Sequence, residues 1–345
     1  MTSLALRSIC LAALLLASAN AGADSASLLT QASGATPARV DYARQQGATI
    51  SDTSDNKAFT LWWQPSSSAP TAVIVSLHGH ASWAFDEFYL WHPYAKTRNY
   101  AVLALQWWFG GGDTTSDYYQ PSEMYPLVAA ILKQKGIAPG QALLHGYSRG
   151  SANSYAMAAL DSNSANRYFG TVLSNAGGAV SGFPPNDEIA AGKFGALPFS
   201  GLKWIMYCGE KDATPDRDGC PAMNKARDWV QKYGATVSLF IDDPNGDHGG
   251  FHQNPANVNA ALAAFAPSSP YSDAERLYNW GECKYPSLLQ PKATSTALFG
   301  YWARCYAQSV CIGIRDDTLW FFDGRTVSKL GPVGSFLTGL PASGC

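Results

Sequence analysis

One short stretch of the chain combines a serine with the flanking patterns that nucleophilic catalysis requires. Residues 141–146 form an apolar, strand-like run, Gly146-Tyr147-Ser148-Arg149-Gly150 follows as a Gly-x-Ser-x-Gly turn, and small residues continue as a predicted helix. This is the layout of a nucleophile elbow, in which a sharp turn exposes a serine at the N-terminus of a helix. Glycine on both sides lets strand and helix pass closely. Ser148 is therefore the candidate nucleophile.

A serine nucleophile needs a histidine base. Two histidines follow Ser148 in the chain, His248 and His252. His248 lies in an Asp-His-Gly-Gly loop directly after the last predicted strand, where an imidazole can reach over the sheet to the elbow. His252 lies further along the same loop, so we predict His248 as the base.

The base needs an acid that fixes its tautomer, and in this type of fold the acid precedes the histidine in the chain. Asp212 lies on the loop that leaves the preceding predicted strand, so its carboxylate can face His248. Asp216 and Asp218 lie on the same loop and could compete. We predict Asp212 as the acid.

Two backbone N–H groups must point at the developing oxyanion. One is expected from Arg149, directly after the nucleophile. The other is expected from the loop after the first buried strand, from His80 or, less firmly, from Ala81. We interpret His78 in that loop as structural and His145 beside the elbow as a hydrogen-bonded core residue.

Aromatic residues cluster near this predicted entrance. They include Trp83, followed by further aromatics up to residue 91, and then Trp107 and Trp108 ahead of three glycines. Core packing is one interpretation of these side chains. The other is an acyl or aromatic subsite beside Ser148, formed by Trp83, Trp107 and Trp108.

Apolar runs and helical spacing predict the elements that position these residues. Runs typical of buried parallel strands occupy residues 71–80, 100–106, 141–146, 170–175, 202–208 and 236–242, and an edge strand is expected over 58–63. Helical patterns occupy 121–135, 221–234 and the segment of Val258, Leu262 and Phe265. Alternating strands and helices predict a doubly wound, mostly parallel α/β sheet, with ligands at the carboxyl ends of the strands.

The chain has 345 residues, of which 46% are hydrophobic, enough for one full-size core and a smaller unit. Its formal net charge of −2 gives no electrostatic case for binding nucleic acid or an anionic membrane surface. Residues 1–21 resemble a secretory signal, with Ala19-Asn20-Ala21 as the cleavage site and Ala21-Gly22-Ala23 as a second option. The apolar run is too short to span a membrane. We therefore expect a secreted, extracellular or periplasmic protein.

The composition predicts four segments after the signal. Residues 22–57 are expected to be a loose leader followed by the first edge structure, and residues 58–266 the catalytic domain. Residues 267–271 form a linker. Residues 272–345 form a small, mostly β module, with a capping box at its start and a closing helix from Val333 to Leu340.

Six cysteines follow the signal, an even number that favours disulfides in an exported chain. Cys208 and Cys220 bracket the loop of Asp212, and a disulfide between them would hold the acid in place. The alternative is that each pairs with the C-terminal module. The four remaining cysteines lie in that module and allow three pairings: Cys283, Cys305, Cys311 and Cys345. No spacing resembles a zinc site, and we expect no metal or other cofactor.

The motifs together resemble the α/β-hydrolase superfamily over about residues 58–266. They are Leu77-His78-Gly79, Gly146-Tyr147-Ser148-Arg149-Gly150, Gly209-x-x-Asp212 and Asp247-His248-Gly249, in that order. The compact layout and export signal are similar to secreted esterases of the polyhydroxyalkanoate-depolymerase and feruloyl or acetylxylan esterase groups. The resemblance implies a Ser148, His248 and Asp212 triad, with the amides of His80 and Arg149 as the oxyanion hole. The C-terminal module resembles a short domain appended to various exported bacterial proteins.

These expectations describe a secreted serine hydrolase that cleaves small-molecule or polymeric carboxylic esters through an acyl-enzyme. A triad cannot by itself separate esters from amides, so a serine peptidase or amidase of the same fold is the first alternative. The second is a surface binding protein with an inactive hydrolase domain. The intact order of Ser148, Asp212 and His248 argues against the second alternative.

Overall fold

The computed structural model describes residues 24–65, 70–179, 181–265, 277, 280, 281, 284, 291–298, 301–306, 310–315 and 318–337. The predicted signal at residues 1–21, the linker at 267–271 and the capping box at its end lie outside the described residues, as do Cys283 and Cys345. No helix in the described part of the chain combines the length and apolar character needed to cross a membrane.

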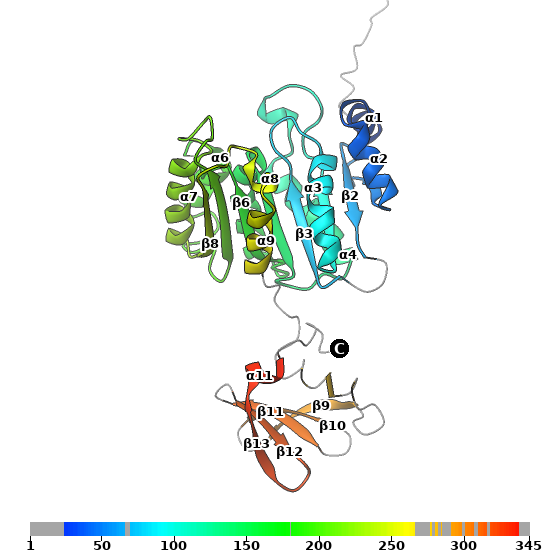
Figure 1. The fold of residues 1–345 in the computed structure, drawn as a ribbon, viewed down its shortest axis with the longest axis vertical. Helices are drawn as coiled ribbons and strands as arrows, with labels where there is room; N and C mark the ends of the chain where they lie inside the picture. Colours follow the sequence, from blue (N-terminus) through cyan, green and yellow to red (C-terminus); the bar gives the residue numbers. More distant parts are fainter. Residues whose placement is uncertain are drawn as a thin grey trace, which may run out of the picture.

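An eight-stranded sheet forms the larger part of the molecule (Figure 1). In spatial order its strands are β1 (Thr49–Asp52), β2 (Phe59–Trp63), β4 (Tyr100–Leu105), β3 (Ala72–Leu77), β5 (Ala142–Tyr147), β6 (Phe169–Asn175), β7 (Lys203–Gly209) and β8 (Thr236–Asp243). Strands β3 to β8 are parallel, and β1 and β2 are antiparallel. This confirms the predicted doubly wound, mostly parallel sheet of the α/β-hydrolase type.

Helices cover both faces of the sheet. One face carries α3 (Ala84–Thr97), α8 (Gly250–Gln253) and α9 (Pro255–Ala264), which lie in front of the strands in Figure 1. The other face carries α4 (Pro121–Gln134), α5 (Arg149–Ser162) and α7 (Cys220–Lys232). Aromatic rings join these helices to the sheet: Tyr155 of α5 stacks on Trp204 of β7, with centroids 5.6 Å apart, and meets Trp229 of α7 edge-on.

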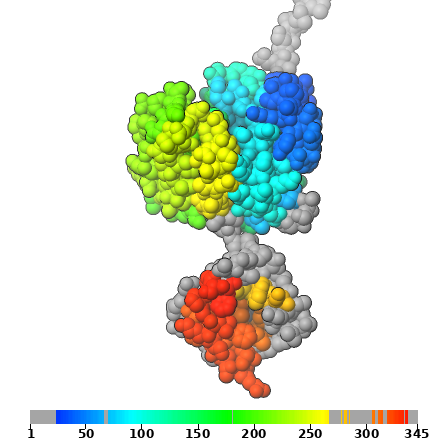
Figure 2. All heavy atoms as spheres, viewed as in Figure 1, coloured from blue at the N-terminus to red at the C-terminus, as the bar shows by residue number. Residues whose placement is uncertain are grey.

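The N-terminal segment differs from the prediction of a loose leader. Residues 22–57 contain α1 (Ser25–Ala35), α2 (Pro37–Gln45) and β1, and the core includes Leu28 and Val40 from these helices. The Tyr42 hydroxyl contacts His92 Nδ1 of α3 at 2.8 Å, and Figure 2 shows the blue N-terminal helices against the cyan surface of α3. Because β1 pairs with β2, residues 59–63 are also not the edge strand we expected. Alanine in both helices favours helix formation, and the burial of Leu28 and Val40 in the core adds to that propensity.

The loops that carry the predicted site residues lie at one end of the parallel strands, and the chain leaves the domain at the other end. The carboxyl ends of the parallel strands gather at one edge, where the loops after β3, β5, β7 and β8 lie. After α9, Phe265 is buried and its ring lies 5.7 Å from that of Tyr100, the first residue of β4. The chain therefore leaves this domain at the amino ends of the parallel strands, opposite to those loops.

A second, antiparallel sheet follows, in the order β13-β12-β11-β10-β9. Its strands are β9 (Pro291–Leu298), β10 (Tyr301–Tyr306), β11 (Cys311–Arg315), β12 (Thr318–Phe322) and β13 (Val327–Pro332), and α11 (Val333–Leu337) follows. Buried Leu277, Tyr306, Ile312 and Leu319 form its own hydrophobic cluster. A disulfide joins Cys305 to Cys311 across β10 and β11. The predicted small, mostly β module with disulfide support is confirmed.

Candidate active site

The turn between β5 and α5 has the strained backbone that an elbow requires. Ser148 lies at φ 52° and ψ −117°, in the positive-φ region that non-glycine residues rarely adopt. A Cβ atom added to Gly146 would lie 2.3 Å from the carbonyl oxygen of Gly150, and one added to Gly150 would lie 2.3 Å from that of Leu77. Only glycine fits at either position, because strand and helix backbones are in contact there.

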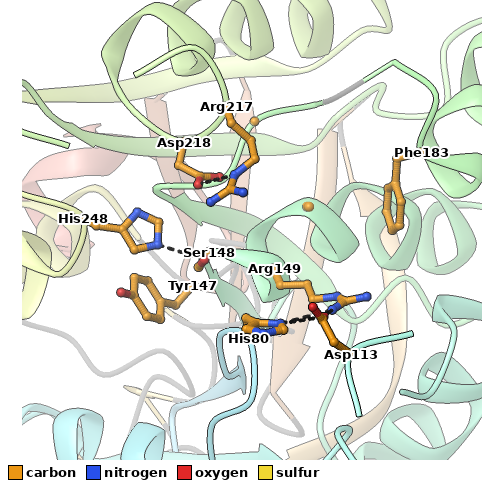
Figure 3. Close-up of a pocket in the computed structure, with 11 residues that line it drawn as sticks. His80, Asp113, Tyr147, Ser148, Arg149, Phe183, Arg217, Asp218 and His248 are labelled. Atoms are coloured by element: carbon orange, nitrogen blue, oxygen red, sulfur yellow. Dashed lines mark hydrogen bonds and ion pairs between the residues drawn. The ribbon is translucent and has the colours of Figure 1, made fainter. Parts of the chain in front are cut away.

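Three side chains from three loops form one hydrogen-bonded line. His248 Nδ1 lies 2.7 Å from Asp212 Oδ2, and His248 Nε2 lies 2.9 Å from Ser148 Oγ. A carboxylate only accepts, so Nδ1 carries the proton and Nε2 accepts from the serine hydroxyl. This is the tautomer that a histidine base needs. In Figure 3 the dashed line between His248 and Ser148 marks this contact at the cavity wall.

The environment of Asp212 keeps it ionised. Its side chain is 1% exposed, and Oδ1 accepts hydrogen bonds from the Thr214 N–H (2.8 Å) and hydroxyl (3.0 Å). Burial raises the pKa of Asp212, but these hydrogen bonds and the one from His248 lower it more, so the pKa lies below its ordinary value. A disulfide between Cys208 and Cys220 closes the loop that carries Asp212, which is the predicted pairing.

The competing residues have other partners. Asp218 Oδ2 accepts a hydrogen bond from Arg217 Nε at 2.7 Å and lies 2.8 Å from Thr214 Oγ1. The ring of His252 packs 4.8 Å from that of Trp91. Of the residues that we weighed as acid and base, the structure brings Asp212 and His248 together at Ser148.

The loop after β3 lies directly against the elbow. A Cβ atom on Gly79 would lie 3.0 Å from the Tyr147 ring and 3.5 Å from Ser148 Cβ. His78 is fully buried and its Nε2 accepts the N–H of Trp107 at 3.2 Å, in keeping with a structural role. Within the described residues we find no acceptor for the His80 N–H, whereas the Ala81 N–H donates to Tyr118 Oη at 3.1 Å. The Arg149 N–H is in the first turn of α5, where helical N–H groups have no intrahelical acceptor.

His145 lies in β5, three residues before the nucleophile, and is fully buried, as predicted. Its Nδ1 accepts from Trp91 Nε1 at 3.1 Å and lies 2.8 Å from Ser76 Oγ, which donates to Glu87 at 2.7 Å. Its Nε2 lies 3.3 Å from the Asn175 amide. This network fixes the base of the elbow between α3, β3 and β6.

A cavity of about 610 Å³ opens beside Ser148. Its lining combines apolar surface, including Tyr147 and Phe183, with charged groups on opposite walls (Figure 3). The lining residues are His80, Asp113, Tyr147, Ser148, Arg149, Ala152, Gly178, Phe183, Arg217, Asp218 and His248. No sequence pattern singled out Asp113, Phe183 or Arg217, which come from loops without a regular pattern.

The tryptophans predicted as a subsite do not line this cavity, which corrects that expectation. Trp107 is 1% exposed and its Nε1 donates to the carbonyl oxygen of His78. Trp83 is 7% exposed and its ring meets that of Trp108 edge-on, 5.2 Å away. These side chains pack against the core and within the loop before η1 (Thr115–Asp117).

One group of side chains within the described residues is close enough together to suggest a metal site: Cys208, Cys220 and Asp242. Its two sulfur atoms are joined in the disulfide, so they are not thiolate ligands. The group is therefore explained by the disulfide.

No family model matches the chain, and no curated protein matches its sequence. Similar solved structures include an esterase/lipase from an uncultured bacterium (14% identity, TM-score 0.46, 63% of this chain and 82% of that chain covered). They also include esterases from Rhizomucor miehei (12%, 0.48, 69% and 89%) and esterase B from Lactobacillus rhamnosus (14%, 0.44, 69% and 93%).

Proposed function

We propose that this chain is a serine hydrolase that cleaves carboxylic esters. The observation that carries the proposal is the line from Asp212 through His248 to Ser148, with contacts of 2.7 and 2.9 Å, on the wall of a cavity. A hydroxyl, a neutral imidazole and a buried carboxylate in this order are the groups that acyl transfer requires.

In the proposed reaction His248 Nε2 takes the proton of Ser148 as its oxygen attacks the ester carbonyl. The tetrahedral oxyanion is bound by the N–H groups of His80 and Arg149, and the imidazolium is stabilised by Asp212. His248 then gives the proton to the departing alcohol, which leaves an acyl group on Ser148. Water, deprotonated by His248, releases the acid and restores the hydroxyl.

The ion pairs in the cavity lining support small, polar esters as substrates. Arg149 and Arg217 each form an ion pair with a carboxylate there, at 3.1 and 2.7 Å. A long aliphatic acyl chain would have to displace water from these charged groups without replacing their hydrogen bonds, which is unfavourable. We therefore propose short acyl groups. We also infer export, on the basis of the pattern at residues 1–21 and the two disulfides.

Hydrolysis of p-nitrophenyl esters from acetate to octanoate tests this proposal, with and without a serine-directed phosphonate. The proposal predicts phosphonate-sensitive turnover that is fastest on acetate and declines with chain length. Turnover of peptides or anilides but not of esters would favour the peptidase or amidase alternative. Absence of both turnover and labelling at Ser148 would favour a non-catalytic protein.

A further inference from the structure

We propose that the Arg149 side chain is a positioning residue, which clamps the elbow to the loop carrying His80 and so sets the spacing of the two oxyanion-binding amides. The proposal rests on the proposed function. It adds a role for the Arg149 side chain that is separate from that of its N–H group.

The guanidinium group of Arg149 touches both neighbouring loops. Its carbon lies 3.8 Å from the ring centroid of Tyr118, close enough for a strong cation–π contact. Its Nη1 lies 3.1 Å from His80 Nδ1 and 3.1 Å from Asp113 Oδ1. Arginine stays protonated and only donates, so His80 Nδ1 accepts in this hydrogen bond. Figure 3 shows Arg149, His80 and Asp113 meeting below Ser148.

Tyr118 extends the clamp to the backbone of the His80 loop. Its hydroxyl lies 2.9 Å from His80 Nδ1 and accepts the N–H of Ala81 at 3.1 Å. Ala81 is held at φ 45°, a conformation that alanine adopts only when its surroundings enforce it. Because Tyr118 engages the Ala81 amide, the His80 amide is the one left to meet an oxyanion.

Tyr118 is itself held in place by packing and backbone pairing. It is 3% exposed, its backbone forms a β-bridge with Trp108, and its ring lies 4.9 Å from that of Trp107. Asp113, by contrast, has a side chain that is 75% exposed, and an ion pair so close to solvent stabilises little. The stacking on Tyr118 and the contact with His80 are therefore the contacts that hold the Arg149 side chain between the two loops.

The clamp matters because the two amides belong to separate segments. The Arg149 amide begins α5 behind the strained Ser148, and the His80 amide lies on the loop between β3 and α3. Oxyanion donors act only within about 2.7–3.1 Å of the developing charge. A side chain that bridges both segments holds this spacing before the substrate arrives, at no cost during the reaction.

Arg149→Met tests the clamp, because it removes the charge but leaves the Arg149 N–H in place. We expect kcat on p-nitrophenyl acetate to fall by about 10- to 100-fold, with little change in KM, since a misplacement near 1 Å has an effect of this size. Labelling of Ser148 by a fluorophosphonate and affinity for a trifluoromethyl ketone, which forms an oxyanion on the enzyme, should fall by the same factor. Arg149→Lys keeps the charge without the planar group and should recover only part of the loss.

Two further variants separate positioning from general damage. Arg227→Met is the matched control, because Arg227 lies over the Phe240 ring at 5.4 Å on α7, outside the cavity, and should leave kcat and the fluorophosphonate rate unchanged. Tyr118→Phe removes the hydroxyl that holds Ala81. In the double variant with Arg149→Met, the fold-decrease in kcat should be smaller than the product of the two single decreases, because both substitutions act on one loop.

A raised KM with unchanged kcat would overturn the clamp and assign the guanidinium to substrate binding. Equal rates for Arg149→Met and the wild-type chain would also overturn it, while leaving the proposed function intact. Failure of the proposed function itself would be seen in the wild-type chain, as absence of both ester turnover and fluorophosphonate labelling at Ser148, and the clamp would fail with it.

Discussion

The chemistry at the residue scale depends on one proton. Because Asp212 accepts from His248 Nδ1 at 2.7 Å, the opposite nitrogen stays free to take the proton of Ser148. Thr214 holds the carboxylate from its other side, which keeps Oδ2 directed at the imidazole. The orientation of His248 is thus set by the buried Asp212 carboxylate, which Thr214 holds in place.

Asp212→Asn should therefore abolish most activity while the fold remains intact. An asparagine amide at this position can donate to Nδ1, which would favour the tautomer with its proton on Nε2. We expect kcat to fall by about 10⁴-fold, as the wrong tautomer does in serine proteases. Asp218→Asn is the comparison, because Asp218 bonds Thr214 and Arg217 rather than His248. Similar losses in both variants, measured by ester hydrolysis, would contradict the assignment of Asp212.

The order of Ser148, Asp212 and His248 along the chain was enough to predict which residues meet, because each follows a recognisable strand of a parallel sheet. The cavity walls could not be predicted in the same way. Phe183 and Asp113 lie on irregular loops, and only the folded path brings them beside Ser148. The predicted tryptophan subsite was wrong for the same reason. An aromatic residue near a predicted entrance can point into the core, as Trp107 does.

At the scale of elements, the elbow is held by close backbone contacts. The carbonyl oxygens of Leu77 and His78 would lie 2.3 and 2.6 Å from a Cβ atom on Gly150. Backbone atoms cannot move aside as side chains can, so β3 and α5 would have to separate. The sequence predicted this requirement from the Gly-x-Ser-x-Gly spacing alone.

Gly150→Ala should destabilise the protein by about 2–3 kcal/mol, the usual effect of overpacking. It should also lower activity, because α5 carries the Arg149 amide. Gly34→Ala in α1 is the matched control: it has no atom within 4 Å of the added methyl group, and helical alanine should stabilise by about 0.5–1 kcal/mol. Denaturant unfolding measures both, and equal midpoints for the two variants would show that the contact at Gly150 is tolerated.

The N-terminal elements were the least predictable. Residues 25–45 lack a strong apolar periodicity, and α1 and α2 exist because Leu28, Ala32, Val40 and Ala43 find places in the core. The antiparallel pair β1 and β2 then closes that edge of the sheet. Such structure follows from tertiary packing, which local patterns do not report.

At the scale of the molecule, two hydrophobic cores are built from different parts of the chain. The larger core runs from Leu28 to Phe265, and the cluster of Leu277, Tyr306, Ile312 and Leu319 belongs to the second sheet. The chain leaves the first core at the edge of the sheet opposite Ser148, where Phe265 meets Tyr100.

A chain that ends at Pro267 should therefore fold and keep its kcat/KM on a small soluble ester within about twofold, since a domain with its own core folds alone. Binding to an insoluble ester is the property that the truncation is expected to weaken. Parallel assays of the full and shortened chains on p-nitrophenyl acetate decide this. Loss of activity together with a lowered melting temperature would show that the C-terminal module supports the catalytic domain.

Buried histidines make the whole fold sensitive to mild acid. Burial lowers the pKa of His78 and His92 to about 4 and that of His252 to about 3. In the unfolded chain these groups are protonated below about pH 6.5, so unfolding takes up protons and stability falls as the pH falls from 6.5 towards 4. Each histidine should contribute about 1.4 kcal/mol per pH unit in this window.

Denaturant midpoints at pH 7, 6 and 5 measure this effect above the range in which ordinary carboxylates titrate. His78→Gln, which keeps an acceptor for the Trp107 N–H but does not titrate, should reduce the slope. A midpoint that stays constant from pH 7 to pH 5 would contradict the burial of these imidazoles in neutral form.

The most direct test of the central claim is p-nitrophenyl acetate hydrolysis by the wild-type chain and by Ser148→Ala, with melting temperatures measured on the same samples. We predict saturable turnover by the wild-type chain and a fall in kcat of about 10⁵-fold or more in the variant, as when a triad serine is removed. The melting temperature should not fall, because the substitution removes no packing contact that stabilises the elbow. Retention of wild-type turnover by Ser148→Ala would show that the nucleophile lies elsewhere.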